Sequence, residues 1–283
     1  MFIKKHKSKN QYILTQSVFV RDFTNDNCIP LDINQLSSNT DESLYIDNEF
    51  ENFTQRYANI DNENLHHSKV VIVSDGHNFK SKQDVLAKLP KDVAIIGVNG
   101  SLKYWKLLGN SDLKRAINYY VVNNPYKECT EFLPTQHRYY PKCIASSRTN
   151  PGFLKKYLGN KYIYTPVENE KYSGIERFTN YKIDDYRNPV CAAISLAYRF
   201  AASKILMFCC DSSFADERPG AEKLDNGLWC YPQQQLSKSI IDSMFYWLNC
   251  KKIEIGDCSA GGKYNNAKYI ESEDDVVRYF NDE

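Results

Sequence analysis

The sequence lacks several features that would assign it to a common class of protein. No stretch approaches about 18 consecutive apolar residues, so we expect no membrane span. None of its nine cysteines forms a CxxC pair, and Cys209 and Cys210 are adjacent within an apolar run. This argues against a zinc cluster or a disulfide framework. It favours buried, reduced thiols in a cytoplasmic protein.

The charge balance lacks a basic surplus. The chain has 36 basic and 35 acidic residues and a net charge of +1, which makes nucleic acid an improbable partner. The N-terminal stretch MFIKKHKSKNQY is basic, but no apolar run follows it, so we expect no signal peptide. Small-molecule substrates are the expected partners. The sequence leaves open whether the chain forms a homo-oligomer.

Two regions of the chain differ in composition and in the pattern of their apolar residues. Residues 1–68 are rich in Asn, Asp and Ser and contain β-like segments at 12–20, 31–33 and 44–46, which predicts a small β-rich N-terminal subdomain. Residues 69–283 alternate short apolar runs with helical patterns. The expected strands are 70–73, 93–98, 117–122, 143–145, 162–164, 204–210 and 252–255, and the expected helices lie near 81–89, 101–109, 189–202, 233–249 and 273–281.

This alternation predicts an α/β fold, a Rossmann-like, doubly wound and mostly parallel sheet. In such sheets ligands bind beyond the carboxyl ends of the strands. The residues that follow the predicted strands are therefore the candidate ligand-binding residues: Asp75, Gly76, His77, Asn78, Asn99, Gly100, Asn123, Asn124, Asp211 and Ser212. Each has a structural alternative as well, because Asn and Gly are common in ordinary turns and Asp can close a strand.

The start of the helix predicted from residue 189 is a second candidate ligand-binding site. Asn188 is a favourable N-cap and Pro189 suits the first helical position. The free N–H groups here, near Val190, form a natural anion site. A carboxylate beside a bound di- or triphosphate needs a cation between them, so Asp211 and Asp75 are candidate Mg²⁺ ligands.

Three stretches together resemble a known family. They are SDGHNF (74–79), NPVCAAISLAYRFAASKILMFCCDSSF (188–214) and EIGDCSAGGKYNNAKYI (254–270). Their order resembles the MptE-like domain family, which includes archaeal 6-hydroxymethyl-7,8-dihydropterin diphosphokinases and, more distantly, motility accessory factor glycosyltransferases. The resemblance implies Mg²⁺-dependent transfer of diphosphate from ATP to a hydroxymethylpterin-like alcohol, with Asp211 and Asp75 on the metal.

The chain departs from that pattern in ways that favour other activities. The Pro-Ser pair of the family turn is missing, and Asn123-Asn124-Pro125 stands where the family often has Asp. The Asn-Pro pair is similar to bacterial sialyltransferases, which implies a CMP-sugar bound at Gly76, Asn99 and Asn124. Those enzymes use a histidine base in the second half, but no histidine follows His137. A non-catalytic nucleotide-binding or assembly domain is the third alternative.

Overall fold

The computed structural model describes most of the chain. The described residues are 17–21, 28–32, 42–60, 65–76, 78–105, 116–134, 140–166, 182–211, 213, 217, 220–224, 227–259 and 264–281.

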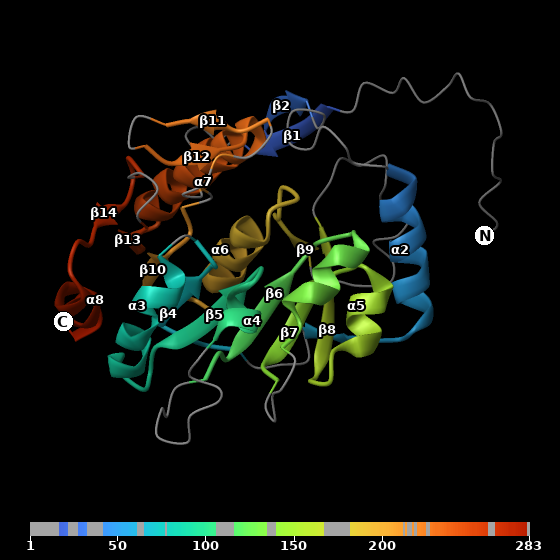
Figure 1. Cartoon of the computed structure of the whole chain (residues 1–283), viewed down its shortest axis with the longest axis horizontal. Coiled ribbons are helices and arrows are strands. Elements are labelled where there is room, and N and C mark those ends of the chain that lie inside the picture. The colour runs from blue at the N-terminus through green and yellow to red at the C-terminus, as the bar shows by residue number, and fades with distance from the viewer. Residues whose placement is uncertain are drawn as a thin grey trace.

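A long parallel sheet organises this structure (Figure 1). The strand order is β14-β13-β10-β4-β5-β6-β7-β8-β3, β9 also pairs with β8, and every one of these pairings is parallel. The strands are β3 (Ala58–Asn59), β4 (Lys69–Val73), β5 (Ala94–Val98), β6 (Tyr119–Val122), β7 (Lys142–Ser146), β8 (Lys161–Pro166), β9 (Lys182–Ile183), β10 (Lys204–Phe208), β13 (Glu254–Cys258) and β14 (Lys268–Tyr269). The predicted α/β fold with a mostly parallel sheet is confirmed.

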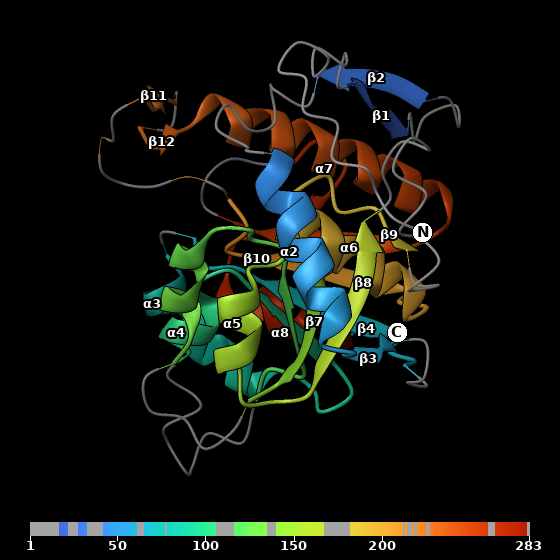
Figure 2. The same cartoon turned by 90° about the vertical axis from the view of Figure 1, so that its right-hand side faces the viewer.

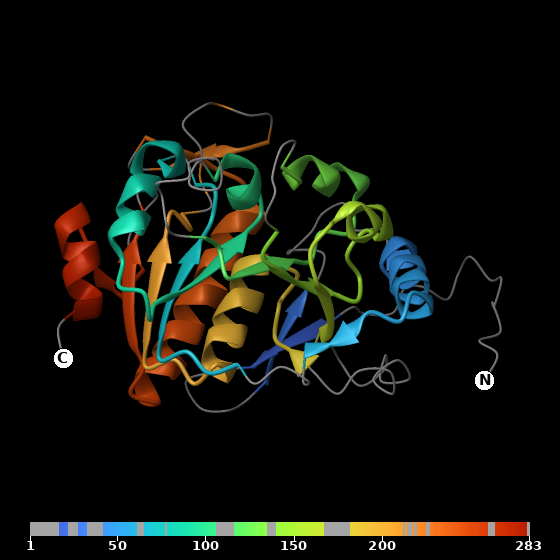
Figure 3. The same cartoon turned by 90° about the horizontal axis from the view of Figure 1, so that it is seen from below.

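Helices cover both faces of the sheet, which explains why the central strands are apolar throughout (Figure 3). In β4, Val70 and Ile72 pack into a cluster with α6 and α7, whereas Val71 and Val73 pack into a second cluster on the other face. The helices are α2 (Glu42–Thr54), α3 (Phe79–Lys82), α4 (Ser101–Tyr104), α5 (Pro151–Lys156), α6 (Pro189–Arg199), α7 (Pro232–Cys250) and α8 (Glu273–Asn281), with 3₁₀ helices η2 (Gln83–Lys88) and η4 (Lys127–Phe132).

The path of the chain creates a switch point in the sheet. From β4 the chain moves in one direction through β5, β6, β7 and β8, then returns through α6 to β10 on the other side of β4. The connections after β4 and β10 therefore diverge to opposite sides. This divergence opens a crevice at the carboxyl ends of the strands, where doubly wound folds bind their ligands.

The helix after residue 188 begins where the sequence predicts, but it ends at Arg199 rather than at residue 202, because Ala201 adopts a left-handed conformation with a φ of 58°. The Asn188 side chain accepts a hydrogen bond from the Val190 amide at 2.8 Å, and Pro189 occupies the first turn. Ala192 and Ala193 are fully buried, so the helix lies close to the sheet. Helices α7 and α8 also agree with the predicted ranges. None of the helices within the described residues is long and apolar enough to cross a membrane.

The N-terminal region differs in part from the prediction. β1 (Ser17–Arg21) and β2 (Cys28–Asp32) form an antiparallel hairpin, as the β-like segments suggested. The segment 44–46 was predicted as β-like, and this is wrong, because it lies in α2. Three apolar residues cannot distinguish a strand from a helix; the burial of Tyr45, Asn48, Glu49 and Asn52 follows the helical period. The domain division at residue 68 stays a prediction.

Two asparagines hold α2 to the rest of the fold. Asn48 donates to the Pro125 carbonyl at 2.9 Å and to the Arg148 carbonyl at 3.2 Å. Asn52 donates to the carbonyls of Ser147 and Thr149 at 2.9 and 2.6 Å. α2 therefore satisfies backbone groups in the loops that follow β6 and β7, and in Figure 2 it lies in front of β7 and β8.

Asn52→Ala should destabilise the protein by about 1–3 kcal/mol, because two buried carbonyls lose their donor. Thr54→Ala on the same helix is the matched control, since its hydroxyl makes only exposed hydrogen bonds, to the Glu51 carbonyl and from the Gln55 side chain. Urea denaturation of both variants measures the difference. Equal stability of the two variants would contradict a clamping role for Asn52.

Candidate functional site

The turn after β4 is joined to the turn after β10. The Gly76 amide donates to the Cys209 carbonyl at 3.0 Å, and the Ser74 amide donates to the Phe208 carbonyl at 3.1 Å. A Cβ atom at Gly76 would overlap the Asp211 carboxylate and the Cys209 carbonyl. Gly76 is therefore required by the close approach of Asp211.

The strand before Asp211 is shorter than predicted. β10 ends at Phe208, and Cys209 adopts a left-handed conformation with a φ of 54°, so the chain leaves the sheet there rather than at residue 210. This turn brings Asp211, which is 4% exposed, back against Gly76.

A second turn encloses Asp75. A Cβ atom at Gly100 would overlap the Asp75 carboxylate, and Ser74 Oγ donates to Asp75 Oδ1 at 3.3 Å. Burial raises the pKa of Asp75, while the amides of Asp75 and Gly100 and the Ser74 hydroxyl oppose that rise. Asn99 is left-handed, with a φ of 52°, and its carbonyl accepts from the Tyr120 hydroxyl at 2.6 Å. The turn after β5 thus wraps the carboxylate that follows β4.

Asp257 is a site residue that the sequence interpretation missed. The last strand was expected to end at residue 255, but β13 continues to Cys258 and carries Asp257 at its carboxyl end. Its side chain accepts from the Ser259 amide at 3.0 Å, and the residue is 1% exposed. The strand-end rule that selected Asp75 and Asp211 would also have selected Asp257 if the strand had been placed correctly.

Burial raises the pKa of Asp257 to about 6. The hydroxyl and amide of Ser259, the charge of Lys238 and the Tyr264 amide oppose this rise. The neighbouring strand ends are linked, because the Cys210 amide donates to Ser259 Oγ and the Tyr264 hydroxyl donates to the Cys210 carbonyl, each at 3.0 Å.

A cavity of about 380 Å³ lies beyond Asp211. Its size falls within the range of small-molecule sites, roughly 300–1,000 Å³. Lys238 lines it from α7, and its ammonium nitrogen lies 5.4 Å from the centre of the Tyr264 ring. The lining residues are Asp211, Leu224, Cys230, Gln234, Gln235, Lys238, Ser239, Asp242, Tyr264 and Asn265.

The other predicted residues lie at the same edge but have structural bonds. Asn123 donates to Asp185 Oδ2 at 3.4 Å, and Asn124 accepts from the Tyr126 amide at 2.9 Å. The Asn78 carbonyl accepts from Ser81 and Lys82 at the start of α3. The ligand-binding roles of these asparagines, and those of Asn188, Pro189 and Val190, stay predictions.

Two predicted site residues, His77 and Ser212, lie outside the described residues. Within the part of the chain that is described, no group of three or more His, Cys, Asp and Glu side chains could hold a metal ion. The Mg²⁺ site predicted at Asp75 and Asp211 stays a prediction.

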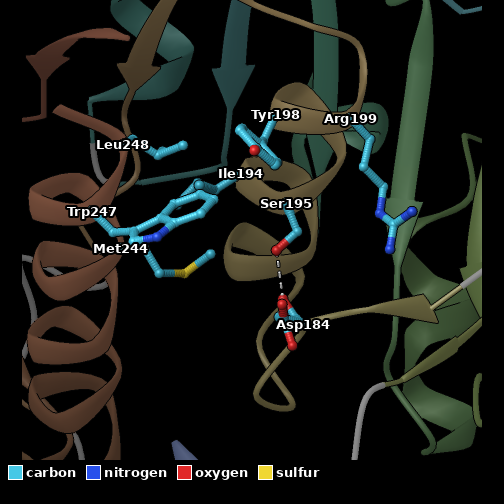
Figure 4. A pocket seen from close by; sticks show the side chains of 8 residues that line it. All are labelled: Asp184, Ile194, Ser195, Tyr198, Arg199, Met244, Trp247 and Leu248. Carbon is cyan, nitrogen blue, oxygen red and sulfur yellow. Dashed lines mark hydrogen bonds between the residues drawn. The ribbon is translucent and has the colours of Figure 1, made fainter. Parts of the chain in front are cut away.

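A separate groove of about 330 Å³ lies between α6 and α7 (Figure 4). Trp247 and Tyr198 meet edge to face, with ring centres 4.8 Å apart, and the Ser195 hydroxyl donates to the Asp184 carbonyl at 2.8 Å. The groove contains none of the residues that follow β4, β5 or β10. It is therefore distinct from the crevice at the switch point.

No protein-family model and no curated protein sequence matches the chain. The fold is similar to the solved structure of the MAf glycosyltransferase from Magnetospirillum magneticum AMB-1, with a TM-score of 0.55 and 13% sequence identity. The match covers 84% of this chain and 41% of that chain, so the chain spans less than half the length of this neighbour. At this level of identity the similarity shows the fold alone. The pterin diphosphokinase side of the resemblance stays a prediction.

Gly76→Ala should destabilise the protein by about 2–3 kcal/mol, because the new methyl group meets a backbone carbonyl as well as Asp211. Gly100→Ala is the matched comparison. The three atoms nearest to its methyl group all belong to the Asp75 side chain rather than to backbone, so its cost should be about 1 kcal/mol. Denaturant unfolding of both variants tests this order, and a reversed order would contradict the described turn.

Asp257→Asn should change how stability depends on pH. Because the folded-state pKa of about 6 exceeds the ordinary value of 3.8, the favourable contribution of protonated Asp257 is complete below about pH 4 and is lost as the pH rises through 6. The variant should therefore be more stable than the wild type at pH 8, by on the order of 2 kcal/mol, with the gap closing near pH 4.

Denaturant unfolding at pH 4, 6 and 8 measures this gap. Asp92→Asn is the control, because Asp92 is exposed and lies 3.1 Å from Lys69 at the amino end of the strands. A constant difference between wild type and Asp257→Asn at all three pH values would disprove the burial argument.

Proposed function

We propose that the chain is a glycosyltransferase that binds a nucleotide-sugar, of the CMP-sugar kind, at the carboxyl ends of β4, β5 and β10. The observation that carries this proposal is the cavity lined by Asp211, the residue that follows β10 on one side of the switch point of the sheet. The fold similarity to a solved glycosyltransferase supports it.

The cavity offers groups suited to glycosyl transfer. In this reaction the bond between the sugar carbon and the donor phosphate breaks, and a bond to an acceptor oxygen forms. The acceptor proton goes to a base. Asp211 is the candidate for this base because it lines the cavity. Lys238 stabilises the negative charge that develops on the departing phosphate.

A second candidate is transfer of diphosphate from ATP to a hydroxymethylpterin-like alcohol. The approach of Asp211 to Gly76, the residue directly after Asp75, favours it, because it brings two carboxylate residues to neighbouring strand ends. Here Asp75 and Asp211 would hold Mg²⁺, which neutralises charge on the phosphates. The two candidates differ in the nucleotide they require and in their need for metal. A cytoplasmic location and self-association also remain predictions.

Asp211→Asn should lower turnover of the productive donor by about 100-fold or more while nucleotide binding persists, because the base is lost but the cavity keeps its shape. CMP release from a panel of CMP-sugars, and ATP consumption with and without Mg²⁺, measure turnover. Calorimetry with CMP and ATP measures binding.

The control is Asp92→Asn, at the opposite end of the strands, which should behave like wild type. Turnover of Asp211→Asn at the wild-type rate would exclude Asp211 as the base. Mg²⁺-dependent ATP binding that Asp211→Asn abolishes would favour diphosphate transfer instead. No binding of any nucleotide by the wild type would favour the non-catalytic alternative.

A further inference from the structure

Tyr264 lines the cavity and contacts two of the segments that form it. The residue follows β13 in the chain and is 4% exposed. Its hydroxyl donates to the Cys210 carbonyl at 3.0 Å, and the Lys238 ammonium nitrogen lies 5.4 Å from the centre of its ring. Cys210 directly precedes Asp211, and both Asp211 and Lys238 line the cavity. One side chain thus contacts Lys238 and the residue next to Asp211.

The Tyr264 hydroxyl acts as a hydrogen-bond donor at neutral pH. Burial raises the pKa of Tyr264 well above its ordinary value, so the hydroxyl keeps its proton. The acceptor of this bond, the carbonyl of Cys210, belongs to a residue that is only 1% exposed. Because a buried carbonyl without a donor is costly, the bond holds the peptide between residues 210 and 211 in one orientation.

The backbone before Asp211 is also held from two other directions. The Cys209 carbonyl accepts from the Gly76 amide, and the Cys210 amide donates to Ser259 Oγ, each at 3.0 Å. Together with the bond from the tyrosine, these contacts connect the turn after β10 to the chain that follows β4 and β13, its two neighbours in the sheet. The direction in which Asp211 leaves the turn is therefore set by other segments of the chain.

Tyr264 itself is fixed by α7. Its ring meets the ring of Phe245 edge to face, with centres 5.1 Å apart. The next residues of the loop bond to Asp242, whose carboxylate accepts from the Asn265 side chain at 3.1 Å and from the Asn266 amide at 2.9 Å. Phe245 and Asp242 both belong to α7, which also lines the cavity. The tyrosine is therefore held against the helix that forms one side of the cavity.

The ring of Tyr264 holds Lys238 in a different way. The face of a tyrosine ring attracts a cation that lies within about 6 Å of its centre. Within the described part of the chain, the Lys238 ammonium group forms no hydrogen bond and no ion pair, so its N–H groups can bind a ligand in the cavity. The ring thus keeps the ammonium group beside the cavity without occupying those donors.

We propose that Tyr264 is a positioning residue for glycosyl transfer, whose hydroxyl orients Asp211 through Cys210 and whose ring orients Lys238. The reaction needs a base for the acceptor hydroxyl and a cation for the departing phosphate, and a single rigid side chain sets the place of both. The inference rests on the proposed function, because it takes Asp211 and Lys238 as the groups that act on the substrate. The bond to Cys210 then affects turnover, whereas the contact with Lys238 affects donor binding.

Two substitutions of Tyr264 separate these roles. Tyr264→Phe keeps the ring but loses the hydroxyl, so turnover of the productive CMP-sugar should fall about tenfold while the affinity for CMP stays within about twofold of wild type. Tyr264→Leu loses both contacts, so the affinity for CMP should also fall, by about fivefold or more. CMP release measures turnover, and calorimetry with CMP measures affinity.

Tyr279→Phe is the matched control. Tyr279 is also 4% exposed, and its hydroxyl donates to the carbonyls of Ile205 and Glu254 at 3.1 and 3.0 Å, near the amino ends of β10 and β13. This variant should lose stability but keep wild-type turnover. Melting temperatures show whether each variant is folded. If Tyr264→Leu is not, the comparison of Tyr264→Phe with Tyr279→Phe decides.

An Asp211→Asn background provides a result that a purely structural role would not give. If the hydroxyl acts through Asp211, Tyr264→Phe should lower the remaining turnover by less than about twofold in that background. The proposal would be overturned if Tyr264→Phe turned over the donor as fast as Tyr279→Phe. The same tenfold loss with and without the Asp211 carboxylate would also overturn it.

Failure of the proposed function has a different signature. Turnover that depends on Asp211 but not on the Tyr264 hydroxyl would reject the positioning role and keep the proposed function. A wild type that neither binds CMP nor releases it from a CMP-sugar would reject the proposed function. Hydrogen exchange then decides: faster exchange of the Cys210 amide in Tyr264→Phe than in Tyr279→Phe would still support the anchoring of Asp211, and equal exchange would overturn it.

Discussion

The bond between the Gly76 amide and the Cys209 carbonyl is the contact on which the candidate site depends. It holds together the ends of β4 and β10, the two strands between which the chain reverses its direction across the sheet. Because residue 76 has no side chain, Asp211 can lie directly against the turn. The crevice, the cavity beside it and the orientation of the carboxylate all follow from this approach.

The carboxyl ends of three neighbouring strands carry buried or half-buried acidic residues. Asp75, Asp211 and Asp257 come from three neighbouring strands, and burial raises the pKa of Asp75 and Asp257. The raised pKa values of Asp75 and Asp257 mean that these two carboxylates reduce stability at neutral pH. Sites that do chemistry commonly accept this cost, because a group that titrates near the working pH can exchange protons. Lys238 supplies the opposing charge from α7.

The N-terminal segment completes the other half of the edge. α2 reaches the loops after β6 and β7 through Asn48 and Asn52 and brings Tyr45 to Arg148 and Arg187. A Rossmann-like core alone would leave these loops open to solvent. The segment that was predicted as a β-rich subdomain thus packs, through α2, against the loops at the carboxyl edge of the sheet.

The sequence by itself determined the α/β class, the central strands and the helix after Asn188, because each rests on local patterns: continuous apolar runs, helical periodicity and a capping residue. It also selected Asp75, Gly76 and Asp211, since they follow such strands. Asp257 was missed because its strand boundary was misplaced, and α2 because its burial pattern includes polar residues. Only the tertiary structure decided which strands are neighbours and that Tyr45 meets Arg148 and Arg187. Those contacts join segments about 100 residues or more apart, and no local pattern encodes them.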